Sequence, residues 1–274
     1  MSRASRGPLF IAVVSVVLIS GCAGTPVPDS EASTATPVDP MAEAVVDDSF
    51  AVDGDRSLHL ECFGAGRPVI VFDAGTDTAG ASFWRSERVF RDLAHDTEVC
   101  AYDRAGLGES DPAPDHARVL DDAVADLDAL LTAAAIPGPY VLVGSSGGGF
   151  NVYQHAGRHP QNVTGLVMLD VPRGQSSITE EELGGTWRDN SEHMDYVSIE
   201  HQMDLARLPI PAIPVTVVAA SNGQSADPAE QKVWLEGSSH PVFVTLSGGH
   251  EIYRDAPEET AQEIRKVLEL ARAQ

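Results

Sequence analysis

The sequence predicts an α/β protein with a mostly parallel sheet and helices on both faces. After residue 48, short apolar stretches typical of strands alternate with longer stretches of helical spacing, which is the order expected of a parallel sheet. Some of these apolar stretches contain no polar residue, as in strands that are buried on both faces. The chain has 274 residues, a length that suits one large α/β domain or two small ones.

The chain begins with the features of an export signal. Arg3 and Arg6 precede an apolar run from Leu9 to Ile19, which is too short to span a bilayer comfortably. The run ends in Leu18-Ile19-Ser20-Gly21-Cys22, which resembles the lipobox of bacterial lipoproteins. This resemblance implies a signal peptide over residues 1–21, lipidation of Cys22 and anchoring to the outer face of the bacterial cell membrane. An ordinary secretory signal with an incidental cysteine is the alternative.

Residues 22–48 are rich in Thr, Pro, Ser, Asp and Glu and poor in apolar side chains. Such a composition cannot bury enough apolar surface to fold, so it predicts a disordered tether. We expect the folded domain over residues 49–274.

The charge and the cysteines limit the possible functions. A formal net charge of −23 disfavours nucleic acid and polyanionic substrates, because the summed field repels them. The three cysteines match no zinc-binding pattern, and no metal or cofactor is expected. In an oxidising compartment Cys62 and Cys100 could form a disulfide, and two buried free thiols are the alternative.

The first half of the domain contains a hairpin, two strands and one helix. An Asp-Gly turn joins two alternating segments, which is typical of a hairpin. The next strands are short and apolar, and the helix follows from the spacing of Trp84, Val89 and Leu93. In order, these elements are strands 49–52 and 57–62, strand 68–72, helix 83–95 and strand 97–102.

The second half repeats the alternation and includes one long irregular stretch. Leu120, Val124, Leu127, Leu130 and Leu131 form one face of a helix that ends before a Pro-Gly-Pro sequence. After it come the strand beginning at Tyr140, a helix to about 159, strand 163–169, strands 214–220 and 242–246, and a closing helix 257–273. Residues 171–208 are polar and irregular, and we expect them to form a short lid.

A G-x-S-x-G motif follows the strand that begins at Tyr140. Ser146 is its central residue, and Gly144 and Gly148 flank it two positions away on either side. A serine on so sharp a strand-to-helix turn leaves no room for a Cβ at these neighbours. Ser145 is the rival nucleophile, but the residue two positions before it is Val143 rather than glycine, so Ser146 is preferred.

Four motifs occur in the order that the α/β-hydrolase fold superfamily uses. They are Ala74-Gly75-Thr76, the stretch from Asp103-Arg104 to Glu109-Ser110, the serine motif, and Gly248-Gly249-His250 before the last helix. The chain after the tether therefore resembles this superfamily. The resemblance implies Ser146 as nucleophile, His250 as general base, and the backbone N–H groups of Thr76 and Gly147 as the oxyanion hole.

The acid of the implied triad has two candidates. Asp170 ends the strand after the serine motif, a position used by some lipases of this fold, whereas Asp227 follows strand 214–220. We prefer Asp170 and keep Asp227 as the alternative. Ala74 stands where the superfamily usually has His, so other groups must hold the oxyanion loop, with Asp73 and Asp77 as candidates. Asp103 and Arg104 are expected to brace the fold.

The leading hypothesis is an exported serine hydrolase that cleaves carboxylic esters through an acyl-enzyme intermediate. Its expected substrate is a small neutral or cationic ester, and its expected membrane contact is the lipid anchor at Cys22. A peptidase or amidase, an acyltransferase of the same fold, and a non-catalytic envelope binding protein are the alternatives.

Overall fold

The structure, a computed structural model, describes residues 39–274. The predicted signal peptide, the predicted lipidation site Cys22 and most of the predicted tether lie outside these residues. The first strand, β1 (Val46–Asp53), begins slightly before residue 49. Within the described range, no helix combines the length and the apolar character needed to cross a bilayer.

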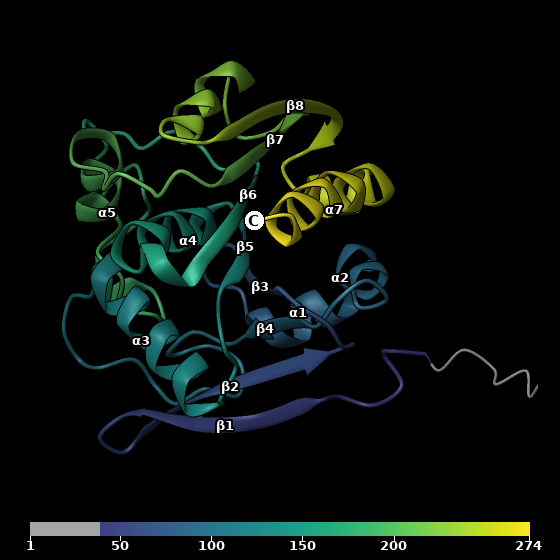
Figure 1. Cartoon of the computed structure of the whole chain (residues 1–274). Helices are drawn as coiled ribbons and strands as arrows, with labels where there is room; N and C mark the ends of the chain where they lie inside the picture. Colours follow the sequence, from purple (N-terminus) through teal and green to yellow (C-terminus); the bar gives the residue numbers. More distant parts are fainter. Residues whose placement is uncertain (1–38) are drawn as a thin grey trace, which may run out of the picture. The chain divides into compact units, whose positions relative to one another are not determined.

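One eight-stranded sheet organises the domain (Figure 1). The β1–β2 and β2–β4 pairs are antiparallel, and all other neighbouring pairs are parallel, which confirms the predicted mostly parallel sheet. From one edge to the other the strands are β1, β2 (Arg56–Phe63), β4 (Val99–Tyr102), β3 (Val69–Asp73), β5 (Tyr140–Ser145), β6 (Val163–Leu169), β7 (Pro214–Asn222) and β8 (His240–Gly249).

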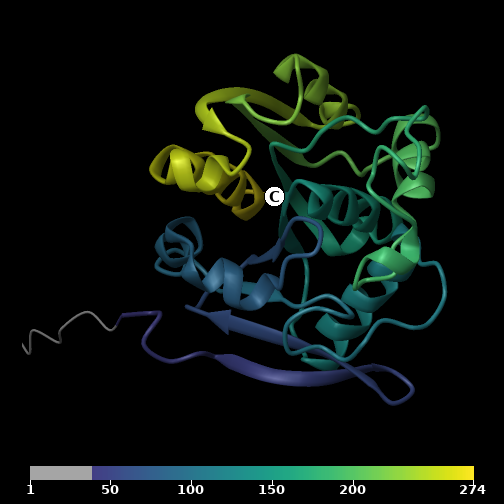
Figure 2. The same cartoon turned by 180° about the vertical axis from the view of Figure 1, so that it is seen from behind.

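Helices cover both faces of this sheet, as the two opposite views show (Figures 1 and 2). One apolar core receives side chains from α3 (Leu120–Ala133), α4 (Gly147–Arg158) and α5 (Tyr196–Leu205). The other receives them from α1 (Gly80–Ser86), α2 (Arg88–Leu93), α6 (Ile252–Asp255) and α7 (Pro257–Arg272).

The sequence of strand β3 is almost continuously apolar because both faces of the strand are buried. Val69 and Val71 lie in the core beneath α3 and α4, whereas Ile70 and Phe72 lie in the core beneath α1 and α7. Successive side chains of a strand point to opposite faces, so a strand covered on both sides needs apolar residues at every position.

The predicted pairing of Cys62 with Cys100 is confirmed. The two residues face each other across the β2–β4 pair and form a disulfide. Both side chains are fully buried. The bond therefore links the hairpin to the rest of the sheet.

Three segments differ from the sequence prediction. The single helix predicted over 83–95 is two helices, because Glu87 between them has extended backbone angles. The lid is not wholly irregular: it contains α5 and a short 3₁₀ turn at Trp187–Asp189. A further 3₁₀ segment, η3 (Pro228–Leu235), follows β7. Helix α5 lacks a strong sequence pattern because it buries only Ile199 and Met203.

Candidate active site

The sheet gathers the predicted site residues at the carboxyl ends of its parallel strands. Thr76 follows β3, Ser146 follows β5, Asp170 follows β6 and His250 follows β8. Strands β3, β5, β6, β7 and β8 are neighbours in this order, and every pair of them is parallel. Their carboxyl ends, including those of the four strands that precede these residues, therefore lie along one edge of the sheet. Ligands of open α/β sheets bind at this edge.

Ser146 occupies a strained turn between β5 and α4. Its φ of 52° lies in the left-handed region, which is unfavourable for a residue with a side chain. A Cβ on Gly144 would lie 2.5 Å from Val152 Cγ2, and one on Gly148 would lie 2.3 Å from the carbonyl oxygen of Ala74. Both glycines are therefore required by close packing, as the motif predicts. Ser145 is buried at the end of β5, whereas Ser146 is partly exposed.

The two predicted oxyanion-hole residues are neighbours. A Cβ built on Gly147 would lie 3.5 Å from the backbone nitrogen of Thr76. Gly147 is also the first residue of α4, whose N-terminal N–H groups and dipole favour negative charge. Gly75 lies beside Ser146, since a Cβ on Gly75 would be 3.5 Å from the Cβ of Ser146.

Asp170, rather than Asp227, pairs with the histidine. His250 Nδ1 lies 2.7 Å from Asp170 Oδ2, and the Asp170 side chain is fully buried. Asp227 is exposed, and its carboxylate instead accepts a hydrogen bond from the N–H of Ala229 at the start of η3. A carboxylate at Nδ1 orients the imidazole and leaves Nε2 for proton transfer.

Three further donors hold the Asp170 carboxylate in place. It accepts hydrogen bonds from the backbone N–H groups of Ala220 and Gln224, at 3.0 and 3.2 Å, and from Gln231 Nε2 at 2.7 Å. Burial raises the pKa of Asp170, but the hydrogen bonds from His250 and these three donors outweigh burial and hold the pKa below its usual value. The carboxylate is therefore ionised at neutral pH.

Nε2 of His250 makes no hydrogen bond within residues 39–274, and none joins Ser146 Oγ to this ring. The His250 side chain is 29% exposed, in contrast to the fully buried Asp170 carboxylate. Hydrogen bonds between nucleophile and base are often long in the absence of substrate and tighten when it binds.

Arg104 holds the loop at residues 73–75, which the sequence predicts to be the oxyanion loop and where Ala74 replaces the usual histidine. Its guanidinium donates to the carbonyl oxygens of Ala74 and Gly75, each at 2.7 Å, and to the buried Asp73 carboxylate. The other carboxylate oxygen of Asp73, Oδ2, accepts a hydrogen bond from Tyr102 Oη at 2.8 Å. Of the two candidates from the sequence, Asp73 thus participates, but through an arginine that was expected only to brace the fold.

A lid residue completes this arrangement. Glu192 is 2% exposed and accepts hydrogen bonds from Nε and Nη2 of Arg104, as well as from the backbone N–H of Asp77 at 2.9 Å. Burial raises the pKa of Glu192, but the ion pair and hydrogen bonds with Arg104 outweigh burial and hold it below its usual value. The sequence offers no sign of this pairing, because Glu192 lies in a polar stretch far along the chain from Arg104.

A cavity of about 270 Å³ opens beside Ser146. The predicted lid segment contributes Met194 and Tyr196 to its wall, whereas Trp187 and Met203 of the same segment do not line it. Met203 is instead buried in the core. The lining residues are Thr76, Asp77, Leu120, Ser146, Gly147, Phe150, Asn151, Pro172, Leu183, Glu192, Met194, Tyr196, Ile199, Glu200 and Gln224.

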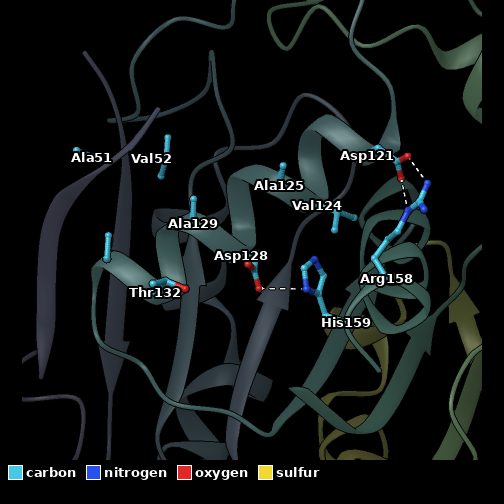
Figure 3. Close-up of a pocket in the computed structure, with 11 residues that line it drawn as sticks. Ala51, Val52, Asp121, Val124, Ala125, Asp128, Ala129, Thr132, Arg158 and His159 are labelled. Atoms are coloured by element: carbon cyan, nitrogen blue, oxygen red, sulfur yellow. Dashed lines mark hydrogen bonds and ion pairs between the residues drawn. The ribbon is translucent and has the colours of Figure 1, made fainter. Parts of the chain in front are cut away.

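A larger hollow of about 720 Å³ lies between β1 and α3 and is a poor candidate for chemistry (Figure 3). Its floor is formed largely by small apolar residues of α3, and its polar side chains pair with each other: Asp121 with Arg158, and Asp128 with His159. Arg158 and His159 stand at the opposite end of α4 from Ser146.

Comparisons with known proteins agree with this fold. A family profile described as the α/β-hydrolase fold matches residues 67–197. The uncharacterized protein YqjL of Bacillus subtilis is 25% identical over 238 residues, which cover 79% of this chain and 90% of YqjL.

Two solved structures of similar fold are enzymes by name. The enol-lactonase of Burkholderia xenovorans is 20% identical, with a TM-score of 0.60 over 80% of this chain and 99% of its own. A thermophilic esterase of Thermogutta terrifontis is 19% identical, with a TM-score of 0.60 over 84% and 99%. The order of the strands, the profile match and these structural likenesses together identify the chain as a protein with the α/β-hydrolase fold.

Proposed function

We propose that this protein is a serine hydrolase that cleaves carboxylic esters through an acyl-enzyme intermediate. The observation that carries the proposal is the pairing of His250 with the buried Asp170 carboxylate at the same sheet edge as the strained Ser146. The esterase and the enol-lactonase of similar fold support an ester or lactone as the substrate class.

In the proposed reaction, the Ser146 hydroxyl attacks the ester carbonyl carbon while His250 Nε2 accepts the hydroxyl proton. The oxyanion that forms accepts hydrogen bonds from the backbone N–H groups of Thr76 and Gly147. His250 then gives its proton to the leaving alcohol, and the acyl group remains on Ser146. Water, activated by the same imidazole, releases the acid. Asp170 stays ionised throughout and stabilises the imidazolium.

A labelling experiment tests the nucleophile. A fluorophosphonate probe should label the wild-type protein, and Ser146→Ala should abolish labelling, while Ser145→Ala should retain it. The same proteins should be assayed with nitrophenyl esters of increasing acyl length. Correctly folded wild-type protein that neither reacts with the probe nor hydrolyses any ester would favour the non-catalytic binding protein.

Related reactions need separate assays, because they would use the same residues. Matched amide and peptide substrates test the amidase alternative. Product analysis in the presence of competing alcohols tests acyl transfer. If the protein is an esterase, it should hydrolyse esters faster than it cleaves amides or peptides and faster than it transfers acyl groups to alcohols.

We further propose that the protein is exported and anchored through a lipid on Cys22. The basic, apolar and small-residue order before Cys22 supports this, and the Cys62–Cys100 disulfide suits an oxidising compartment. In a bacterial expression host, the wild-type protein should fractionate with membranes and Cys22→Ser should not. Equal distribution of the two would contradict the anchor.

A further inference from the structure

We infer that the cavity beside Ser146 is a subsite for a positively charged group, so that the preferred substrates are esters carrying an alkylammonium. This inference rests on the proposed function and specifies its substrate class. It assigns to Asp77 and Glu200 the role of specificity-determining residues.

The charged residues that line the cavity all have the same sign. Asp77, Glu192 and Glu200 contribute carboxylates, and none of the lining residues is Lys, Arg or His. Glu192 is already engaged, because Arg104 binds both of its oxygens. The other two carboxylates are therefore the ones that can act on a ligand.

Asp77 and Glu200 are not neutralised by the protein. Within residues 39–274, neither makes an ion pair with a basic side chain. Glu200 accepts one hydrogen bond, from the backbone N–H of Gln175 at 2.9 Å. Arg173, the nearest basic residue in sequence to Gln175, is paired with Asp204 at 2.8 Å.

The surroundings make these carboxylates costly to ionise. Burial raises the pKa of Glu200 to about 7, with a smaller contribution from the Asp204 charge. Burial and then the Glu192 charge also raise the pKa of Asp77, and the opposing effects of the Arg104 charge and a hydrogen bond with the Ser191 backbone do not cancel this increase. A cation in the cavity would offset both effects, since opposite charge favours the ionised form. None of the residues that line the cavity is basic, so a cationic ligand would bring a positive charge that the lining does not provide.

The remaining walls suit the carbon part of such a ligand. Phe150 and Tyr196 bring aromatic rings to the cavity, and Leu120, Leu183 and Ile199 bring aliphatic surface. Aromatic faces attract alkylammonium groups. The lid carries eight acidic and three basic residues between 171 and 208, and the whole chain carries −23, so the surrounding field also attracts cations.

Matched esters test the inference. The probes are nitrophenyl esters of trimethylammonio-pentanoate, of its uncharged tert-butyl isostere, and of adipate, which carries a carboxylate at the same end. At low salt, kcat/KM for the ammonium ester should exceed that for the isostere by about tenfold, with adipate the poorest. The preference should shrink as salt increases.

Variants that remove one carboxylate charge at a time show which residues cause the preference for the ammonium ester. Glu200→Gln and Asp77→Asn should each lower the ammonium-to-isostere ratio about threefold, and the double variant should bring it near one. Glu269→Gln and Asp55→Asn are matched controls, because they remove the same charge at exposed positions that do not line the cavity. Both controls should keep the wild-type ratio.

The outcomes separate the two proposals. Hydrolysis that requires Ser146 but shows no ammonium preference overturns the subsite and leaves the esterase intact. If no ester is hydrolysed, calorimetric titration of the wild-type protein with the corresponding amides tests the subsite alone. About tenfold tighter binding of the ammonium amide, lost in the double variant, would support it; equal binding would overturn it.

Discussion

The surroundings of Asp170 hold its carboxylate in one position beside His250. Asp170 has a φ of 44°, is completely buried, and accepts four hydrogen bonds, one of them from His250. Gly223 passes so close that a Cβ there would lie 2.1 Å from Asp170 Oδ2. The loop after β7 is thus shaped around this carboxylate.

Replacing Asp170 should therefore impair catalysis far more than replacing Asp227. We expect Asp170→Asn to lower kcat by about 10³-fold or more, since the amide neither fixes the required tautomer nor stabilises the imidazolium. Asp227→Asn should remain within about twofold of wild type, because Asp227 only caps η3. Steady-state kinetics on a nitrophenyl ester, with thermal unfolding as the check on folding, measures both. Similar losses in the two variants would contradict the assignment.

The titration of Glu200 predicts that the preference for the ammonium ester depends on pH. With its pKa raised to about 7 by burial, Glu200 is protonated below this pH and anionic above it. The carboxylates of Asp77 and Glu192 line the same cavity, and Asp204 lies on the same helix. The kcat/KM ratio of the ammonium ester to its isostere should rise about threefold between pH 6 and pH 8. Because both esters use the same His250, titration of the histidine cancels in this ratio.

The matched variants make this pH dependence specific. Glu200→Gln should flatten it, and Glu269→Gln should leave it unchanged. A ratio that rises equally in Glu200→Gln would assign the effect to another group.

At the scale of elements, hydrogen bonds through Arg104 connect the predicted lid segment to the predicted oxyanion loop. Glu192 belongs to the lid segment before α5, and Arg104 follows β4, while the carbonyl groups that Arg104 binds follow β3. Tyr196, at the start of α5, also reaches Glu192 Oε1 at 3.4 Å. A change in the lid can thus alter the position of the Thr76 N–H group.

Removing the charge of Glu192 tests this connection. Glu192→Gln leaves a buried guanidinium without one of its two carboxylates, so the free energy of unfolding should fall by about 3 kcal/mol. If the oxyanion loop shifts, kcat should drop by about tenfold or more with a smaller change in KM. Urea unfolding and steady-state kinetics give the two readouts.

Glu181→Gln is the matched control, since Glu181 is exposed in the same lid. It should match wild type in both readouts. If Glu192→Gln loses stability but keeps the wild-type kcat, the Glu192–Arg104 pair stabilises the fold and does not position the groups that act in catalysis.

At the scale of the whole molecule, the Cys62–Cys100 disulfide closes a loop of 38 residues that contains β3, α1, α2 and the first half of β4. The chain-entropy model assigns such a loop about 4 kcal/mol of stabilisation. The double variant Cys62→Ser/Cys100→Ser should therefore unfold with a free energy lower by about this amount.

Urea unfolding with and without a reductant measures this effect. The reductant should destabilise the wild type and leave the double variant unchanged. Near neutral pH and below the unfolding transition, the double variant should retain ester hydrolysis, because neither cysteine lines the cavity. An unchanged free energy of unfolding would contradict a stabilising role.

Much of this architecture is visible in the sequence because it depends on local patterns. The apolar alternation sets the strands, the glycines around Ser146 mark a turn with no room for a Cβ, and the order of the motifs identifies the fold. The split of the predicted helix at Glu87 is not visible in this way. Its carboxylate binds Arg254, a partner far along the chain.

The sequence by itself therefore determined the sheet and the serine turn, and it offered two aspartates as candidates for the acid. Only the tertiary structure decided that Asp170 meets His250, that Arg104 and Glu192 hold the oxyanion loop, and that Asp77 and Glu200 face one cavity. The physical reason is range. Strand and turn preferences act between neighbours in the chain, whereas hydrogen bonds and ion pairs in a buried site join side chains that only the folded backbone brings together.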